Sequence, residues 1–316
     1  MADSPGLLAT SGVVPPLVTP LDADGEVDVE SMGSLVEHLL AGGVRGLFLL
    51  GSTGEATALS PEQRDRAVRA AVEACGHRVP VLVGVIAPGT AQAANFLLHA
   101  ADCGADGYVA TAPFYAATHQ AEIARHFELL AKAADGAPLY AYNIPNRVGG
   151  TTIEVETLAS LAERGCIRGV KDSSGDLAYL RAVLLARQER RLVLEVLSGS
   201  ELLADLSLLL GADGLVPGLG NIDPAGYVRI VDYVAEGHFD LAQREQERLF
   251  RLFEITTVAE GPRSEGASAL GAFKAALAIL GVIRCDTLAP PLVALTESHR
   301  EQIRSKLVEA GLVDWR

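Results

Sequence analysis

The sequence predicts an α/β fold, a (β/α)8 TIM barrel followed by a helical C-terminal extension. Eight apolar runs are short and continuous rather than alternating, which is typical of strands buried on both faces of a parallel sheet. Helical segments lie between these runs, and the pair repeats about every 25–30 residues, as strand–helix units do. After residue 221 only helical periodicity remains. The eight runs are residues 12–20, 46–51, 79–85, 107–113, 138–145, 167–174, 192–199 and 211–218.

The helical segments carry their own start signals. Ser60 is a favourable N-cap, Pro61 suits the first helical position, and Glu62 adds an acidic residue to the first turn. Similar patterns cover residues 152–163 and 177–187. A doubly wound sheet is the alternative α/β fold. It is disfavoured because the first apolar run is not followed by the GxGxxG turn typical of that fold.

The pattern divides the chain into an N-terminal tail (1–11), a barrel (12–237) and a C-terminal helical region (238–316). Helical periodicity is predicted for residues 224–237, 239–256, 267–280 and 295–310. The C-terminal region either covers one face of the barrel or makes an oligomer contact, and both options remain open.

Composition restricts the class of protein. Hydrophobic residues make up 49% of the 316 residues and charged residues 21%, which excludes a disordered chain. The net charge of −14 repels phosphate backbones, so no nucleic-acid partner is expected. No apolar run reaches the ~20 residues that span a bilayer, and residues 1–12 lack Lys and Arg, so we expect a cytoplasmic protein. The four cysteines fit no CxxC pattern and are expected to be free thiols: Cys75, Cys103, Cys166 and Cys285.

One lysine differs from the others in its predicted position. The four lysines are Lys132, Lys171, Lys274 and Lys306. All but Lys171 lie in helical stretches, where we expect solvated amines. Lys171 ends the sixth predicted strand, on the catalytic face of a barrel. An apolar barrel interior favours an uncharged amine, which can attack a ketone and form a Schiff base. The alternative is a buried ion pair between Lys171 and Asp172 or Glu55.

A glycine-rich turn, GSTGEA (51–56), follows the second predicted strand. Its glycines permit tight turning and expose backbone N–H groups, which suit a carboxylate or a phosphate. No lysine follows, so the turn is not a P-loop. An ordinary strand–helix turn is the other interpretation.

Two tyrosines fall near strand ends at the predicted barrel mouth. Tyr115 closes the fourth strand and Tyr142 lies near the end of the fifth. A phenol at the mouth can relay protons to a Schiff-base intermediate, with Ser52 or Thr53 completing a hydroxyl relay. Buried aromatic packing is the alternative for each tyrosine.

Four motifs together resemble the dihydrodipicolinate synthase / N-acetylneuraminate lyase family of class I aldolases. They are GSTGEA (51–56), APFY (112–115), YNIPNRVG (142–149) and GVKDSSGD (169–176), and the resemblance runs over residues 12–310. It implies a (β/α)8 barrel with C-terminal helices, a homotetramer built as a dimer of dimers, and pyruvate with a small aldehyde as substrates. It implies no cofactor and no metal ion.

The resemblance also implies roles for individual residues. Lys171 forms the Schiff base with pyruvate, Tyr142 relays protons, and Tyr115 reaches into the neighbouring subunit's site. Ser52 and Thr53 match the family's hydroxyl pair, with Thr53 and its amide holding the pyruvate carboxylate. Gly199 and Val216 match positions that line the pyruvate pocket.

The aldehyde partner is left open by the motifs. Arg147 falls where dihydrodipicolinate synthases keep an arginine that grips the carboxylate of aspartate semialdehyde, a task that suits a guanidinium group. Ser52, in contrast, resembles the lyases, because synthases normally have Thr there. The 169–176 segment is also closer to the family's aldolases for hydroxylated 2-oxo acids. The alternatives are therefore N-acetylneuraminate, 2-keto-3-deoxygluconate or 4-hydroxy-2-oxoglutarate aldolases.

Feedback inhibition by lysine is not expected. Lysine-inhibited members tend to have His, His, Asn, Glu and Tyr where this chain has Pro61, Arg64, Pro88, Gln92 and Phe114. Millimolar L-lysine should therefore leave the activity unchanged.

Two other classes of function are alternatives. A metal-dependent class II aldolase needs His and acidic ligands at strand ends, and none of the seven histidines falls there. A non-catalytic 2-oxo acid binding protein would keep the pocket without turnover, but it would not need to retain both tyrosines and both hydroxyls.

Overall fold

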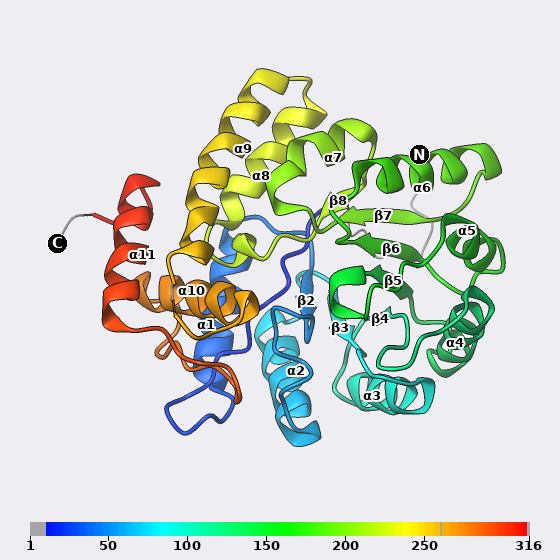
Figure 1. Ribbon diagram of the computed structural model, residues 1–316, viewed down its shortest axis with the longest axis horizontal. Coiled ribbons are helices and arrows are strands. Elements are labelled where there is room, and N and C mark those ends of the chain that lie inside the picture. The colour runs from blue at the N-terminus through cyan, green and yellow to red at the C-terminus, as the bar shows by residue number, and fades with distance from the viewer. Residues whose placement is uncertain (1–10, 260, 315–316) are drawn as a thin grey trace.

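The computed structural model describes residues 11–259 and 261–314. Within these residues eight parallel strands form one sheet in the order β1-β8-β7-β6-β5-β4-β3-β2 (Figure 1). A parallel bridge between Pro16 and Phe48 joins the segment after β1 to β2 and closes the sheet into a barrel. The strands are β1 (Gly12–Val13), β2 (Leu47–Leu49), β3 (Val81–Gly84), β4 (Gly107–Thr111), β5 (Leu139–Asn143), β6 (Gly169–Asp172), β7 (Glu195–Ser198) and β8 (Gly214–Leu215). All eight predicted strands are confirmed.

Helices alternate with the strands and surround the sheet, as Figure 1 shows. They are α1 (Val29–Ala41), α2 (Pro61–Cys75), α3 (Thr90–Asp102), α4 (Gln120–Ala133), α5 (Val155–Glu163), α6 (Leu177–Arg190), α7 (Ala204–Leu210) and α8 (Pro224–Ala235). The predicted start of α2 is confirmed, because the Ser60 side chain accepts a hydrogen bond from the Gln63 N–H in a capping box. The tail, residues 1–11, lies almost entirely outside the described residues.

Strand side chains alternate between two apolar layers. Val109, Tyr140 and Leu197 point into the barrel, where the packed interior leaves a cavity of only about 10 Å³. The residues on either side of them along each strand pack outward against the helices. The interior is therefore a filled core, and chemistry is confined to the rim at the carboxyl ends of the strands.

Three further helices follow the barrel: α9 (Phe239–Phe253), α10 (Glu265–Ile279) and α11 (Glu297–Glu309). In Figure 1, α9 runs beside α8, α10 lies against the barrel on the side of α1, and α11 packs on the outer side of α10. The predicted helical C-terminal region is confirmed, whereas its boundary at residue 237 stays a prediction. No helix in the described part of the chain is long and apolar enough to cross a membrane.

Candidate active site

The structure places Lys171 and Tyr142 side by side on neighbouring strands. Their Cα atoms are register partners across β5 and β6, and both side chains are buried. The Lys171 Nζ lies 4.2 Å from the centroid of the Tyr142 ring and 4.8 Å from that of Phe48. The two rings meet edge to face, with centroids 6.3 Å apart. The amine is thus held between aromatic faces at the end of the barrel core.

Lys171 makes no ion pair with any residue of 11–259 or 261–314, so the buried-ion-pair alternative is wrong. The Asp172 side chain instead accepts hydrogen bonds from Asn143 (2.8 Å) and Ser174 (3.0 Å). Burial raises the pKa of the Asp172 carboxyl. The other candidate partner, Glu55, pairs with Lys274. The prediction that Lys274 is solvated is also wrong, because α10 carries it into the core and its side chain is fully buried.

Gly199 and Val216 lie next to the lysine. A Cβ at Gly199 would fall 3.2 Å from the Lys171 Cε and 2.1 Å from the Ser173 Oγ, so only glycine leaves room for both side chains. Val216 and Lys171 line the same small internal cavity. These neighbours restrict the space around the amine to a small ligand.

A carboxyl group that the sequence analysis missed lies near this lysine. Glu201 follows β7 and accepts hydrogen bonds from the Gly218 N–H (2.8 Å) and the Leu219 N–H (2.9 Å). Burial raises the pKa of Glu201, although the two hydrogen bonds from Leu219 and Gly218 and, to a smaller extent, the charge of Lys171 oppose this shift. The carboxyl therefore fixes the loop after β8. Its position just after a predicted strand could have marked it.

The turn with Ser52 and Thr53 is held in place from several sides. The Gly54 carbonyl accepts a hydrogen bond from the Thr19 Oγ1 (2.8 Å), and the Ala56 carbonyl accepts one from the Arg64 Nη1 (2.7 Å). Glu55 has a left-handed backbone (φ +55°) and a buried side chain. A Cβ at Gly54 would lie about 3 Å from backbone atoms of Leu50 and Leu17, so any side chain there would press on the surrounding backbone. The hydroxyl-bearing turn is thus rigid.

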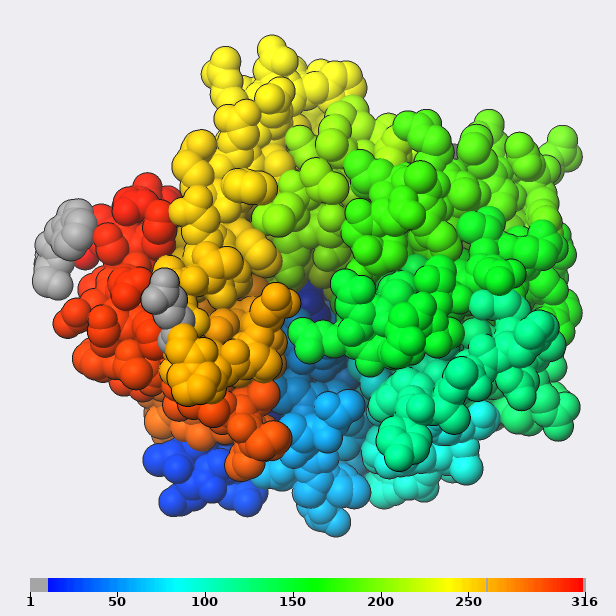
Figure 2. All heavy atoms as spheres, in the orientation of Figure 1, coloured from blue at the N-terminus to red at the C-terminus, as the bar shows by residue number. Residues whose placement is uncertain are grey.

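A cavity of about 660 Å³ opens at the carboxyl ends of the strands. Figure 2 shows the molecule hollowed between the orange C-terminal segments and the green segments that follow β5. The cavity is lined by Ser52 and Arg147 from the barrel loops and by Ser264 and Leu270 from the C-terminal region. Thr53 lies in the adjoining turn and does not line the cavity. The C-terminal region therefore covers one side of the barrel mouth, which is one of the two options left open.

Arg147 lies at the rim of this cavity with an exposed side chain. Its guanidinium lies over the first turn of α10, where a Cβ at Gly266 would be 3.2 Å from its Nη1. Both the guanidinium and a helix N-terminus favour a negatively charged ligand. The predicted carboxylate-binding arginine thus faces the cavity.

Tyr115 is not brought to Lys171 within this chain. It lies four residues beyond the end of β4, and its side chain is 100% exposed. Buried packing is therefore excluded for Tyr115, and so is contact with this chain's own barrel mouth. Its backbone has φ +79°, a value that a non-glycine residue rarely adopts. Such strain is typical of functional positions.

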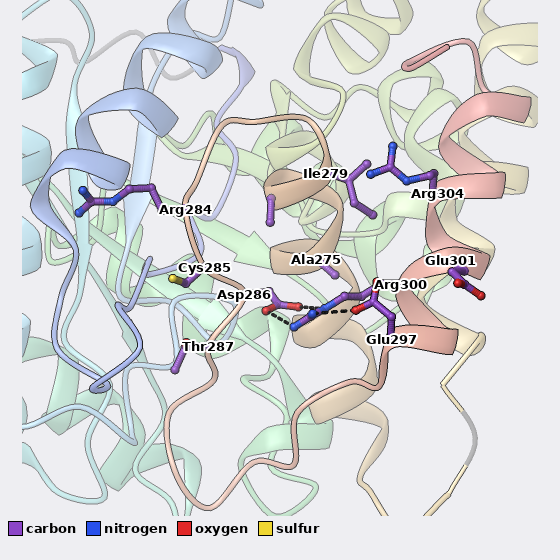
Figure 3. Close-up of a pocket in the computed structure, with 11 residues that line it drawn as sticks. Ala275, Ile279, Arg284, Cys285, Asp286, Thr287, Glu297, Arg300, Glu301 and Arg304 are labelled. Carbon is purple, nitrogen blue, oxygen red and sulfur yellow. Dashed lines mark hydrogen bonds and ion pairs between the residues drawn. The ribbon is translucent and has the colours of Figure 1, made fainter. Parts of the chain in front are cut away.

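A second cavity, of about 440 Å³, lies between residues 284–287, α10 and α11 (Figure 3). Arg300 points across it to Asp286 (2.7 Å) and also donates to Glu297 on its own helix (3.0 Å), whereas Arg284 turns away toward Asp28. Three arginines and three acidic residues balance in its lining. Nothing in this lining favours a charged ligand. Among the described residues, no group of three or more His, Cys, Asp or Glu side chains could hold a metal ion.

A closed parallel barrel with a buried lysine, a phenol and hydroxyls at the carboxyl ends of its strands is the arrangement of a barrel enzyme. The model of the dihydrodipicolinate synthetase family matches residues 9–310. The chain belongs to this family, and it is a lyase.

Relatives support this assignment along almost the whole chain. An uncharacterized DapA-like lyase of Halobacterium salinarum is 36% identical over 306 residues, which cover 97% of this chain and 96% of the relative. A 4-hydroxy-tetrahydrodipicolinate synthase of Syntrophobacter fumaroxidans is 33% identical, covering 96% of this chain and 99% of the relative.

Solved structures agree with the fold. The dihydrodipicolinate synthase of Bacteroides thetaiotaomicron superposes with a TM-score of 0.89 at 34% identity, covering 96% of this chain and 99% of that one. YagE, a prophage protein of the same family from E. coli K12 whose structure was solved with pyruvate, superposes with a TM-score of 0.88 at 28% identity, again covering 96% of this chain and 99% of that one.

Proposed function

We propose that this chain is a class I, pyruvate-dependent lyase of the dihydrodipicolinate synthase type, with Lys171 as its Schiff-base residue. The observation that carries the proposal is the Lys171 amine, buried at a strand end, free of any ion pair among the described residues, and 4.2 Å from the Tyr142 ring centroid. The pyruvate complex of YagE and the synthase names of several relatives support it.

The chemistry follows from the residues present. The Lys171 nitrogen attacks the ketone carbon of pyruvate, and the carbinolamine loses water to give an imine. Loss of a methyl proton gives an enamine, whose carbon attacks the aldehyde carbonyl and forms the new C–C bond. Hydrolysis of the imine then releases the product, and cleavage runs through the same steps in reverse. Tyr142 is placed to relay the protons.

The remaining site residues hold the substrates. Thr53 and its amide hold the pyruvate carboxylate, Ser52 completes the hydroxyl relay with Tyr142, and Gly199 and Val216 limit the pocket to a small 2-oxo acid. Arg147 faces the larger cavity and holds a carboxylate of the aldehyde partner, as in condensation with aspartate semialdehyde. A degradative aldolase of the same family is the alternative, and the serine at position 52 favours it.

Reductive trapping tests the proposal. The protein is incubated with pyruvate and borohydride, and the adduct is mapped by mass spectrometry. We expect one adduct, on Lys171, which is lost in Lys171→Ala. Lys274 is the matched control, because it is also buried but is paired with Glu55, which lines the cavity. The absence of an adduct, or its presence on Lys274, would overturn the proposal and favour a non-catalytic binding protein.

A further inference from the structure

Thr111 belongs to a row of three residues across neighbouring strands. Its Cα is the register partner of Tyr142 on β5, and Tyr142 is in turn the partner of Lys171 on β6. Register partners in a parallel sheet point to the same face. Val109, two residues before Thr111 on β4, packs in the barrel interior, so Thr111 also faces inward. The row thus carries three polar groups on the inner face at one level.

The Thr111 hydroxyl is buried and has no hydrogen-bond partner in the part of the chain that the structure describes. Leaving such a group unpaired costs about 1–3 kcal/mol, whereas the isosteric valine would cost nothing of this kind. Packing alone therefore does not explain a hydroxyl at this position. Thr111 also lines the 660 Å³ cavity that Ser52 and Arg147 share.

We propose that Thr111 is a specificity-determining residue, whose hydroxyl hydrogen-bonds a hydroxyl or ammonium substituent of the aldehyde partner. This inference rests on the proposed function of Lys171. Thr111 lines the larger cavity together with Arg147, whereas Lys171 lines only the small internal cavity, so Thr111 is placed to contact the second substrate. A threonine hydroxyl both donates and accepts, so it serves either substituent. An analogue without the substituent leaves the hydroxyl unpaired and reacts more slowly.

Two pairs of aldehydes, each offered with pyruvate, test the inference. Aspartate semialdehyde and succinate semialdehyde both carry the carboxylate that Arg147 would hold, and they differ only in the ammonium group. Glyceraldehyde and propanal differ only in hydroxyl groups. In at least one pair, we expect Thr111→Val to lower kcat/KM for the substituted aldehyde about tenfold or more and to leave the plain aldehyde within about twofold. Thr111→Ser should restore the preference.

Controls separate this inference from folding and from the proposed function. Thr118 has another buried hydroxyl without a partner among the described residues, but it does not line the cavity. Thr118→Val should leave unchanged, in both pairs, the ratio of kcat/KM for the substituted aldehyde to kcat/KM for the plain aldehyde. The melting temperature of Thr111→Val should equal or exceed that of the wild type, and pyruvate trapping should be unchanged. The role of Thr111 would be overturned if these ratios were unchanged in Thr111→Val. It would also be overturned if the wild type did not prefer the substituted aldehyde in either pair. Failure of the wild type to form the Lys171 adduct would instead overturn the proposed function.

Discussion

Lys274 of α10 forms a buried ion pair with Glu55 of the turn after β2. The Lys274 Nζ also donates to the Thr287 carbonyl (2.7 Å), and the Glu55 Oε1 accepts from the Ala289 N–H (2.7 Å). These bonds connect the C-terminal region to the turn that carries Ser52 and Thr53. Helix α10 and the segment after it therefore help to hold this turn in position.

Breaking this pair on one side should be costly. Glu55→Gln or Lys274→Met leaves an uncompensated buried charge, and we expect each to lower the free energy of unfolding by about 3–5 kcal/mol. Urea denaturation measures the loss. Lys306→Met is the control, because its pairs with Glu254 and Glu309 are exposed and worth about 0–1 kcal/mol. If Lys274→Met proved as mild as Lys306→Met, the pair would not stabilise the fold.

Arg147→Ala should impair the reaction with the aldehyde without impairing the binding of pyruvate. We expect pyruvate trapping on Lys171 to be unchanged, while kcat/KM for a carboxylated aldehyde falls by about two orders of magnitude, because a charge-assisted hydrogen bond is lost. Steady-state kinetics with aspartate semialdehyde measures the fall, and Arg147→Lys should recover part of it. An equal loss of pyruvate trapping would show that Arg147 is structural.

Tyr115 offers a test of assembly. If its exposed side chain completes the site of a neighbouring copy, Tyr115→Phe and Lys171→Ala should each be inactive alone. Mixed after dissociation and reassociation, they should regain activity, since each mixed pair contains one site with both groups. Light scattering should show a homotetramer for the wild type. A mixture no more active than its components would show that Tyr115 does not act across subunits.

His126 predicts a pH dependence of stability. It is buried behind β4, its Nδ1 lies 2.9 Å from the Thr90 Oγ1, and burial lowers its pKa to about 4. The His126 imidazole binds a proton near pH 6.5 in the unfolded chain but only near pH 4 in the folded chain. Stability is therefore fully present above about pH 6.5 and falls by about 3 kcal/mol as the pH drops to 4.

His126→Gln should remove this part of the slope. Urea unfolding between pH 7 and 4 measures it, with His238→Gln as an exposed control that keeps the wild-type slope. If His126→Gln loses stability over this range as steeply as the wild type, His126 is not the group that titrates.

Much of the architecture could be predicted because it is a local property of the chain. Continuous apolar runs mark strands covered on both faces, and Ser60 with Pro61 marks the start of α2. Lys171 could be placed at the catalytic rim because the carboxyl ends of parallel strands meet there. Helix periodicity, however, could not show that α10 buries Lys274, because burial depends on what packs against each face.

The sequence by itself determined the barrel and its strand ends, because these follow from hydrophobic periodicity and from the Gly and Pro residues between apolar runs. It also determined Lys171, Tyr142 and the hydroxyl turn as candidates, because these follow from the order of the motifs. Only the tertiary structure decided their surroundings: that Lys171 has no ion pair in the described chain, that Glu201 lies near it, and that Thr111 joins its row. Residues about 30 positions apart become neighbours only through strand register. That register depends on closure of the whole sheet, which no local pattern encodes.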